Sequence, residues 1–419
     1  MNATSKKIET ASAILPRAEL RPALALAKKI VERRNTIPIL SHVLLRSNSD
    51  GGAEMVATDL DIELVVRING ASADQSFAVT LPAHTFQDIE RKARATEAVA
   101  IDAPVIPAPP VDSLNMEDQA AKDERKAALA AISEAEAVPA TLDFEGLRVT
   151  MHHLPSHDFP EMQWQGETKA DFEIDTADFL HLIEATEFAI STEEIRHYLN
   201  GIYLHSTKGA DGFTYLTSVA TDGHRLAKSI ALCGASGGMP GVIVPRKTVA
   251  LLKSLCKAKD APESVRIKIN TTKALFVIGA VTVLSKMVDG TFPDYGRVIL
   301  RGNDKRVRFD RKAMIEGVKA VACISSERGR AVKFTFEPGA SHAVLTVNNP
   351  DSGTARINVA CEFDADLSLD IGFNYSYVLD ILDTCDGESV TMRLADAGTP
   401  ALISGGNGGD EFVLMPMRV

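Results

Sequence analysis

The sequence of 419 residues predicts an α+β fold in which one structural unit is written three times. Residues 56–59 and 219–222 both read VATD, and residues 347–351 form a weaker third copy. Each copy follows an amphipathic segment at a similar distance, and each unit continues with a second helix and alternating strands. Such self-similarity at a fixed spacing indicates internal repetition.

Helical spacing of apolar residues predicts two helices in each unit. Leu20 and Leu24 illustrate this spacing in the first segment, which favours an amphipathic helix. Pro82 and Pro245 suit a first helical position, whereas Asn374 suits a helix cap. The six expected helices are 17–34, 82–94, 176–190, 245–259, 310–320 and 374–384.

Alternating apolar residues after the second helix of each unit predict strands. A further strand-like stretch covers 142–151, and the glycine-rich residues 405–409 predict a flexible hairpin turn before the last strand. The alternating positions are Val99 and Ile101, then Val265, Ile267 and Ile269, then Val390, Met392 and Leu394.

Three domains of ordinary size fit this length, and we expect them over 1–168, 169–300 and 301–419. A hydrophobic content of 45% is sufficient for three cores. The sequence has no apolar run of about 18 residues and no signal-peptide core, so we expect a cytoplasmic protein with no membrane partner. Five cysteines without a CxxC pair predict reduced thiols.

Residues 103–138 interrupt the repeat, because the other two units have no counterpart. They are rich in alanine, proline and glutamate, and 121–137 has the composition of an exposed helix. We expect a long, partly disordered insertion in a loop between two strands of domain 1. A specific partner site within this insertion is the alternative interpretation.

The net charge of −11 argues against a nucleic-acid partner, but the distribution of charge does not. Basic residues gather in the first and fourth expected helices. One interpretation is a solvated helix face, and the other is a surface that meets phosphate groups within an acidic protein. The residues concerned are Arg17, Arg21, Lys28, Lys29, Arg33 and Arg34, and then Arg246, Lys247, Lys253, Lys257 and Lys259.

No constellation in the sequence predicts catalysis, a metal or a cofactor. Asp222 and His224 are neighbours, but no second histidine or cysteine stands at ligand spacing and no nucleophile is evident. A histidine-rich stretch over 152–157 contains Pro155 and is expected in a loop. We therefore expect a protein without catalytic residues, metal ligands or cofactors.

Ordered motifs occur along nearly the whole chain outside 103–138. They are 36–40 (TIPIL), 57–60 (ATDL), 158–160 (DFP), 198–201 (YLNG), 219–226 (VATDGHRL), 242–247 (VIVPRK), 286–295 (KMVDGTFPDY), 376–380 (SYVLD) and 415–419 (MPMRV). In this order they resemble the bacterial replicative sliding clamps, the beta subunit of DNA polymerase III.

The resemblance implies three DNA-clamp domains per chain, with helices lining a central hole and antiparallel sheets forming the outer wall. Two chains would close head to tail as a homodimeric ring around double-stranded DNA. Such a ring is a non-catalytic processivity factor that tethers the replicative polymerase, and the clamp loader and repair proteins also dock on it through short motifs. Topological binding needs only weak phosphate contacts.

By the same resemblance, partner motifs dock in a hydrophobic cleft between domains 2 and 3. Leucine, valine, proline and adaptable methionine would form its walls, with arginine at its rim. Without the resemblance, 415–417 would be interpreted as a buried terminal strand, and the first tetrapeptide copy as leading into a plain strand at 60–61. The implied cleft positions are Leu199, Thr221, Gly223, His224, Arg225, Leu226, Pro293, Arg297, Val298, Val413, Leu414, Met415, Pro416, Met417 and Arg418.

The resemblance also implies DNA-facing and dimer-facing positions. Departures from the family at His84, Glu193 and His197 predict weaker DNA contact, and those at Gly398 and Pro400 predict a shifted motif preference. The DNA-facing positions are Arg34, Tyr198, Arg225, Arg246 and Lys247. The dimer-facing positions are Val149, Met151, Cys323 and Ile324, with a strand expected over 331–336.

Three rival interpretations remain open. An enzyme of DNA metabolism would need a carboxylate cluster or a nucleophile set, and none stands out. A clamp paralogue that binds DNA without carrying the replicase is disfavoured by the intact 415–418 segment but not excluded. A structural scaffold with no DNA role is the third.

Overall fold

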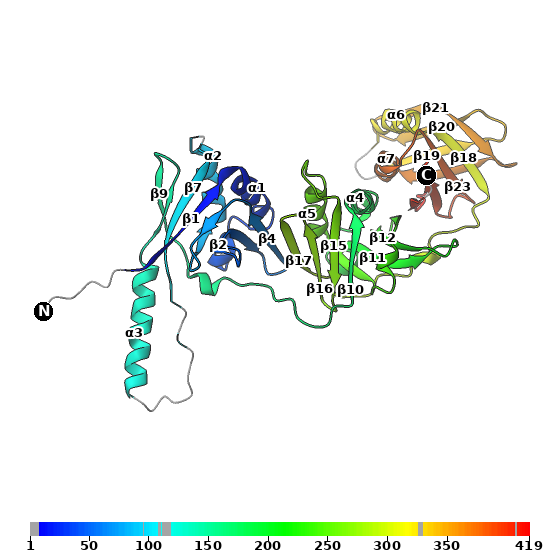
Figure 1. The fold of residues 1–419 in the computed structure, drawn as a ribbon. Coiled ribbons are helices and arrows are strands. Elements are labelled where there is room, and N and C mark those ends of the chain that lie inside the picture. The colour runs from blue at the N-terminus through cyan, green and yellow to red at the C-terminus, as the bar shows by residue number, and fades with distance from the viewer. Residues whose placement is uncertain (1–7, 95, 108–109, 111–118, 326–329, 407–408) are drawn as a thin grey trace. The chain divides into compact units, whose positions relative to one another are not determined.

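The computed structural model describes residues 8–94, 96–107, 110, 119–325, 330–406 and 409–419 (Figure 1). The chain divides into two compact units. The first contains Met1–Glu167 and Lys273–Lys286, and the second contains Thr168–Thr272 and Met287–Val419. No helix in the described ranges is both long and apolar enough to cross a membrane.

In its described residues the first repeat has two core helices, nine strands and the inserted helix. It comprises β1 (Thr10–Pro16), α1 (Arg17–Ala27), β2 (His42–Ser47), β3 (Ala53–Thr58), β4 (Ile62–Ile68), the short β5 (Ser72–Ala73), β6 (Ala78–Pro82), α2 (Ala83–Lys92), β7 (Ala98–Pro104), α3 (Gln119–Glu136), β8 (Ala140–Asp143) and β9 (Arg148–Met151).

The second and third repeats follow the same order of elements without the inserted helix. The second comprises β10 (Ala170–Asp175), α4 (Thr176–Glu184), β11 (Gly201–Lys208), β12 (Thr214–Thr221), β13 (Arg225–Leu232), β14 (Val242–Pro245), α5 (Arg246–Cys256), β15 (Ser264–Ile269), β16 (Lys273–Ile278) and β17 (Val281–Lys286). The third comprises β18 (Lys305–Asp310), α6 (Arg311–Ala322), β19 (Ala331–Phe336), β20 (His342–Asn349), β21 (Gly353–Asp364), β22 (Leu369–Asn374), α7 (Tyr375–Thr384), β23 (Ser389–Leu394), β24 (Ala401–Ser404) and β25 (Glu411–Leu414).

Antiparallel pairing joins these strands into sheets. In the first unit the strand orders are β5-β1-β7-β8-β9 and β16-β17-β4-β3-β2-β6. In the second unit β10 pairs with β15, and the long order is β14-β11-β12-β13-β25-β24-β23-β18-β21-β20-β19-β22. The predicted α+β class and its threefold repetition are therefore confirmed.

Equivalent strands of neighbouring repeats meet at two junctions. β17, the last strand of the second repeat, pairs with β4 of the first repeat. β25, the last strand of the third repeat, pairs in the same way with β13 of the second. The corresponding strands β9 and β21 have no such partner among the described residues: β9 pairs only with β8, and over 353–360 β21 pairs only with β20.

Burial follows the predicted periodicities. Helix α5 buries Val249 and Leu252 to 2% and 1% exposure, and β23 buries Val390 and Met392 to 0% and 1%. Each such side chain contributes about 1.5–3 kcal/mol when it leaves water. Aliphatic burial therefore fixes which face of each helix and strand points inward.

Two first helices are shorter than expected. Helix α1 ends at Ala27 rather than at 34, because the N–H groups of Lys29 and Ile30 donate only three residues back, to the carbonyls of Leu26 and Ala27, both at 3.0 Å. Helix α4 ends at Glu184 rather than at 190, where the Thr186 hydroxyl donates to the Leu182 carbonyl at 2.7 Å. Hydroxyl-to-backbone bonds of this kind compete with helix continuation.

The second helix of each repeat starts close to the expected residue, and one of the three starts agrees with its prediction. Asn374 caps α7 by accepting a hydrogen bond from the Ser376 N–H at 3.0 Å. Pro82 and Pro245 precede α2 and α5 and occupy the cap position, so their expected place at the first helical position is wrong by one residue.

The insertion contains the predicted helix as α3, which Figure 1 shows extending away from β1, β7 and β9. Its last turns are not fully exposed, because Ile132 and Ala135 are 7% and 3% exposed. The His153 Nε2 atom lies 2.8 Å from the Val138 carbonyl and links the end of the insertion to the loop after β9. Partial disorder was expected within 103–138, and residues 108–109 and 111–118 of this insertion lie outside the described residues.

Candidate partner cleft and nucleic-acid surface

The candidate cleft is built on the strand junction between the second and third repeats. Arg225 at the start of β13 lies opposite Leu414 at the end of β25, and Leu226 lies opposite Val413. The Met415 N–H then donates to the His224 carbonyl at 2.9 Å. Antiparallel pairing therefore brings the VATDGHRL motif and the last residues of the chain together.

A cavity of about 220 Å³ opens beside this junction. Its base is an apolar cluster in which Leu199, Leu226 and Val413 are at most 3% exposed. Charged groups occupy only part of the wall. The lining residues are Arg196, Tyr198, Leu199, Thr221, Gly223, Arg225, Leu226, Pro293, Tyr295, Val298, Val413 and Met415.

Most of the predicted cleft positions line this cavity, but six do not. Leu414 is 0% exposed and belongs to the core. His224 is exposed in a turn, and Arg297 is exposed and donates from Nε to Asp294 at 2.9 Å. The chain continues past the cavity through Pro416, Met417 and Arg418, and the Met417 N–H donates to the Gly372 carbonyl at 2.8 Å.

The terminal residues are not the buried strand that composition alone would suggest. Strand β25 ends at Leu414, and Met415 and Met417 are 38% and 36% exposed. A flexible thioether at this exposure can adapt its shape to a ligand. The segment is therefore available to form a wall of the cleft.

Sequence reasoning missed two lining residues, and it assigned a third, Tyr198, to DNA. Arg196 donates from Nη2 to the Asp222 carbonyl at 3.1 Å and from Nε to Glu193 at 2.9 Å, which holds it over the turn before β13. Tyr295 ends the KMVDGTFPDY motif, so the motif itself carried the signal that could have identified it.

The second copy of the tetrapeptide ends in a turn closed by its own side chains. The Thr221 hydroxyl accepts from the Gly223 N–H at 3.1 Å and donates to the Arg225 carbonyl at 2.6 Å. Asp222 Oδ1 accepts from the next two N–H groups, at 224 and 225, at 2.8 and 3.0 Å. These bonds satisfy the backbone where β12 turns into β13.

The first copy makes the same turn at Thr58 and Asp59, so the plain strand expected at 60–61 is wrong. Leu60 has a φ of 74°, in the left-handed region that side chains rarely adopt, whereas the second copy has Gly223 with a φ of 90°. A Cβ atom at Gly223 would lie 2.6 Å from Nη1 of Arg196. Glycine there permits the close approach of Arg196 to the turn.

Arg225 is surrounded by protein partners. Its guanidinium carbon lies 4.4 Å from the ring centroid of Tyr377 and 5.1 Å from that of Phe188. Nε donates to Asp222 at 3.1 Å, Nη1 binds Asp380, and the side chain is 11% exposed. This arrangement positions the cleft wall, and it does not favour the predicted contact of Arg225 with DNA.

An aromatic ladder supports Tyr295 from behind. The His205 Nε2 atom lies 2.9 Å from the Tyr295 hydroxyl, and the His205 ring stacks on Tyr203, which stacks on Phe292 with 4.9 Å between centroids. Burial lowers the pKa of His205 to about 4 and raises the pKa of Tyr295 to about 12. Both rings are therefore neutral near pH 7, and the ladder is a fixed wall.

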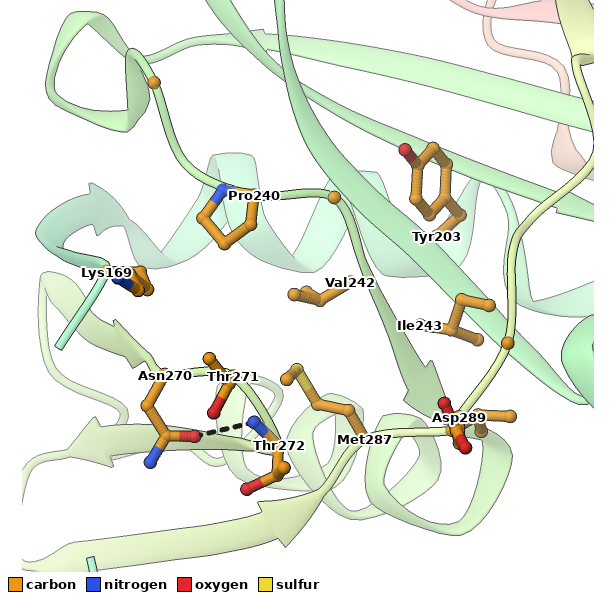
Figure 2. Close-up of a pocket in the computed structure, with 14 residues that line it drawn as sticks. Lys169, Tyr203, Pro240, Val242, Ile243, Asn270, Thr271, Thr272, Met287 and Asp289 are labelled. Carbon is orange, nitrogen blue, oxygen red and sulfur yellow. Dashed lines mark hydrogen bonds between the residues drawn. The ribbon is translucent and has the colours of Figure 1, made fainter. Parts of the chain in front are cut away.

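A larger cavity of about 720 Å³ lies elsewhere in the second unit (Figure 2). Figure 2 shows Lys169 near Asn270 and Thr271, with Asp289 beyond Met287. Asn270 Oδ1 accepts from the Thr272 N–H at 2.9 Å. None of the predicted site residues lines this cavity, so size alone does not identify the candidate site.

Several of the predicted basic residues are neutralised within the protein. Arg17 is 5% exposed and its Nη2 lies 3.0 Å from Oε1 of Glu90, which is completely buried. Lys253 binds Glu187 in the same manner near the surface. The carboxylate of each ion pair offsets the positive charge, so such a lysine or arginine attracts a phosphate less strongly.

Other predicted basic residues are exposed at the surface. Arg34 is exposed in the turn after α1, and the described residues place no carboxylate within ion-pair distance of it. Arg246 and Lys247 are exposed and begin α5, which has no acidic residue in its first turn. The Arg246 Nη2 donates to the Ser191 carbonyl at 2.7 Å, so this guanidinium is exposed but also anchored to the protein.

The predicted dimer positions lie on one sheet edge and one helix end. Val149 is half-buried and Met151 is 6% exposed on the edge strand β9, whereas Cys323 is exposed where α6 ends and Ile324 follows it. The strand expected at the interface over 331–336 is β19, which pairs with both β20 and β22. Both edges of β19 are therefore occupied, and the strand of the third repeat that corresponds to β4 and β13 is β21, which over 353–360 pairs only with β20 among the described residues.

Comparison with protein-family models matches three consecutive parts of the chain. Residues 12–104, 173–294 and 296–418 match the N-terminal, central and C-terminal domains of the DNA polymerase III beta subunit, respectively. These segments support three clamp domains, while the domain boundaries predicted from the sequence remain a prediction.

Full-length relatives and solved structures agree with these matches. The chain is 38% identical over 407 residues to the beta sliding clamp of Caulobacter vibrioides, covering 97% of this chain and 99% of the relative. It is 32% identical over 388 residues to the beta sliding clamp of Escherichia coli K12, covering 92% and 94%. The crystal structure of the Caulobacter crescentus beta sliding clamp superposes with a TM-score of 0.85 at 36% identity, covering 98% and 100%. The structure of a Bartonella birtlesii sliding clamp bound to griselimycin superposes with a TM-score of 0.83 at 36% identity, covering 98% of this chain and 100% of that chain.

Proposed function

Since the chain belongs to the DNA polymerase III beta subunit family, the beta sliding clamps, we propose that two copies close head to tail into a ring around duplex DNA. The family is a non-catalytic processivity factor of DNA replication. In the proposed ring the protein slides without reading sequence, tethers the replicative polymerase, and receives further partners in the cleft beside β13 and β25.

The observation that carries this proposal is a pair of unmatched strand edges. The junctions of β17 with β4 and of β25 with β13 are two copies of one arrangement. A third junction of the same kind would pair β9 with β21. Pairing between two copies is reciprocal, so it satisfies both edges of both chains and closes six repeats.

Unpaired edges also have a cost in an isolated chain. A strand edge presents N–H and C=O groups that can template pairing with another molecule. Ring closure removes these edges, and the apolar side chains of Val149 and Ile324 would be covered at the same time. The predicted dimer positions would then lie at the new junction.

Weak basic contacts suit such a ring. Arg34, Arg246 and Lys247 offer exposed cations, whereas the chain as a whole has a net charge of −11. Phosphate contacts carry no sequence information and weaken as salt rises. A topological ring therefore holds DNA by enclosure and uses these residues to centre it.

The cleft favours a short and mostly apolar peptide. The cavity of about 220 Å³ is bordered by leucine, valine, proline and methionine side chains, and Tyr295 forms a fixed aromatic wall. An extended motif that buries two or three apolar side chains there would desolvate the cluster around Leu199 and Val413. Binding through such a short motif would allow different partners to occupy the same cleft one after another.

Sedimentation velocity tests the proposed junction. We expect the natural chain to sediment as a dimer and Val149→Glu to sediment as a monomer, because a carboxylate would be desolvated in the junction. Leu60→Glu is the control, since Leu60 is 37% exposed in a turn of the same unit. A dimer that persists in Val149→Glu with unchanged affinity would count against pairing through β9.

A further inference from the structure

Outside the cleft, one group of side chains in the described residues converges as metal ligands do. It consists of His181, Asp386 and Asp410, whose ligand atoms all lie within 4.8 Å of one another. The histidine-rich stretch that the sequence displays does not converge in this way: His157 is 3.7 Å from the single carboxylate of Asp158. The converging group therefore comes from residues that are far apart in the chain.

The group bridges two repeats of the second unit. His181 lies on α4 of the second repeat, Asp386 follows α7 of the third, and Asp410 immediately precedes β25. The loop geometry is specific, because the Gly406 N–H donates to the Asp386 carbonyl at 2.9 Å. A Cβ atom at Gly405 would lie 2.8 Å from that same carbonyl, so glycine permits the approach.

The group gathers carboxylates around one imidazole. Asp410 is 8% exposed, and its ion pair in the described residues is with His181 at 3.0 Å. Asp386 adds a second carboxylate at the same point, and Asp178 on α4 adds a third nearby negative charge. A buried carboxylate is costly unless it is paired or coordinated.

The charged surroundings act on His181 in one direction. The hydrogen bond to Asp410, opposed by partial burial and aided by the charges of Asp410, Asp386 and Asp178, raises the pKa of His181. Arg311 lies close by, but it donates to the carbonyls of Gly387 and Leu382.

We propose that His181, Asp386 and Asp410 form a divalent transition-metal site, of the class that binds zinc, which links the second repeat to the third beside the β13–β25 junction. One imidazole and two carboxylates are a donor set that zinc accepts, with water completing the coordination. The metal brings two positive charges to two carboxylates. It holds α4 against the connection that leads into β25.

Calorimetric titration of the metal-stripped, full-length protein with ZnCl₂ near pH 7.5 tests this site. We expect one equivalent per chain, and a rise of about 3 °C or more in the unfolding midpoint at saturation. His181→Gln and Asp386→Asn should each weaken this binding at least tenfold. Co²⁺ added in place of zinc should give visible absorption that is lost in both variants.

The matched control is His157→Gln, which removes a histidine beside one carboxylate and should leave binding unchanged. Unfolding of each variant without metal reports whether it is folded, and the exposed Asp386 offers the milder change if His181→Gln is unstable. Absence of stoichiometric zinc binding would overturn the proposal. Binding that is equally strong in His181→Gln and Asp386→Asn would do so as well, because it would place the metal on other surface histidines.

Discussion

At the residue scale, internal partners decide which basic side chains can meet DNA. The sequence placed Arg17 in a basic helix and Arg225 among the DNA-facing positions. In the structure both side chains are nearly buried and form ion pairs with carboxylates. Arg246 and Lys247 lie at the start of α5 and remain exposed. Residue type alone could not separate these cases, because the acidic partners come from distant parts of the chain.

Removing the two exposed cations of α5 tests their role. In Arg246→Ala with Lys247→Ala, binding to duplex DNA should weaken, and the slope of log affinity against log salt should fall by about 1 to 2. Fluorescence anisotropy across a salt series measures both. The matched control is Arg266→Ala with Lys268→Ala, which removes the same charge from β15, where both residues pair with Asp171. An unaltered salt slope in the α5 variant would show that these residues do not meet phosphate.

His205 gives a pH dependence of stability with a definite sign. The pKa of His205 in the folded protein is lowered from 6.5 to about 4. Between these two pH values the unfolded chain is protonated at His205 and the folded chain is not, so protonation favours unfolding. Stability from this residue is complete above pH 6.5 and is lost as the pH falls toward 4. The loss is roughly 2 kcal/mol after allowance for partial exposure.

Denaturant unfolding at pH 7.5 and pH 5.0 measures this effect. The difference between the two free energies of unfolding should be smaller in His205→Phe, which keeps the stacking on Tyr203 but cannot be protonated. His157→Gln is the control and should retain the difference of the natural chain. If the free energy of unfolding changes equally between pH 7.5 and pH 5.0 in all three proteins, protonation of His205 is not the cause of the change.

At the element scale, periodicity predicted which segments are helices and strands, but contacts between segments decided where they end. The apolar pattern of α1 continues through Ile30 and Val31, so the sequence predicted a longer helix than the structure has. The turn at Leu60 was missed because its left-handed backbone is stabilised by the Thr58 and Asp59 side chains. Long-range pairing is likewise invisible to periodicity, and the junction of β13 with β25 became apparent only in three dimensions.

The candidate cleft illustrates the same division. Family motifs identified Leu199, Thr221, Pro293 and Met415, which the fold brings to one cavity. They did not identify Arg196, whose place over the turn depends on the missing side chain of Gly223. Motif resemblance therefore located the cleft, and geometry was needed to complete its wall.

Shortening the last segment tests the cleft at this scale. Removing 415–419 should abolish binding of a short apolar clamp-binding peptide, since Met415 lines the cavity, while the dimer remains intact. Fluorescence polarisation of a labelled peptide and sedimentation velocity provide the two readouts. Removing Val419 alone is the control, because that residue is outside the cavity lining. Peptide affinity that survives the longer deletion would refute the assignment of this wall.

At the scale of the whole molecule, repetition explains both assembly and specialisation. Three repeats share one order of elements, and two of the three possible junctions are made within the chain. In the proposed ring the third junction would be made with a second copy, so that two chains of three repeats would close the six-repeat ring. The differences between repeats, such as glycine at 223 against leucine at 60, concentrate the partner site in one junction.

The insertion is the one part that repetition does not explain. Helix α3 interrupts only the first repeat, and over 125–136, where burial is described, Ile132 and Ala135 are its buried side chains. The insertion lies between β7 and β8 in the sequence. These two strands nevertheless pair directly, with Ile101 opposite Leu142. The strand framework of the first repeat is thus complete around the insertion.

Retention on DNA of different topology tests the central claim most directly. The protein is loaded onto nicked circular duplex DNA by a clamp loader and ATP, the free protein is removed by gel filtration, and half of the sample is linearised with a restriction enzyme. A ring that holds DNA by enclosure should stay on the circles, leave the linear molecules, and be retained again when bulky proteins block both ends. Equal retention on circular and open linear DNA would contradict the ring.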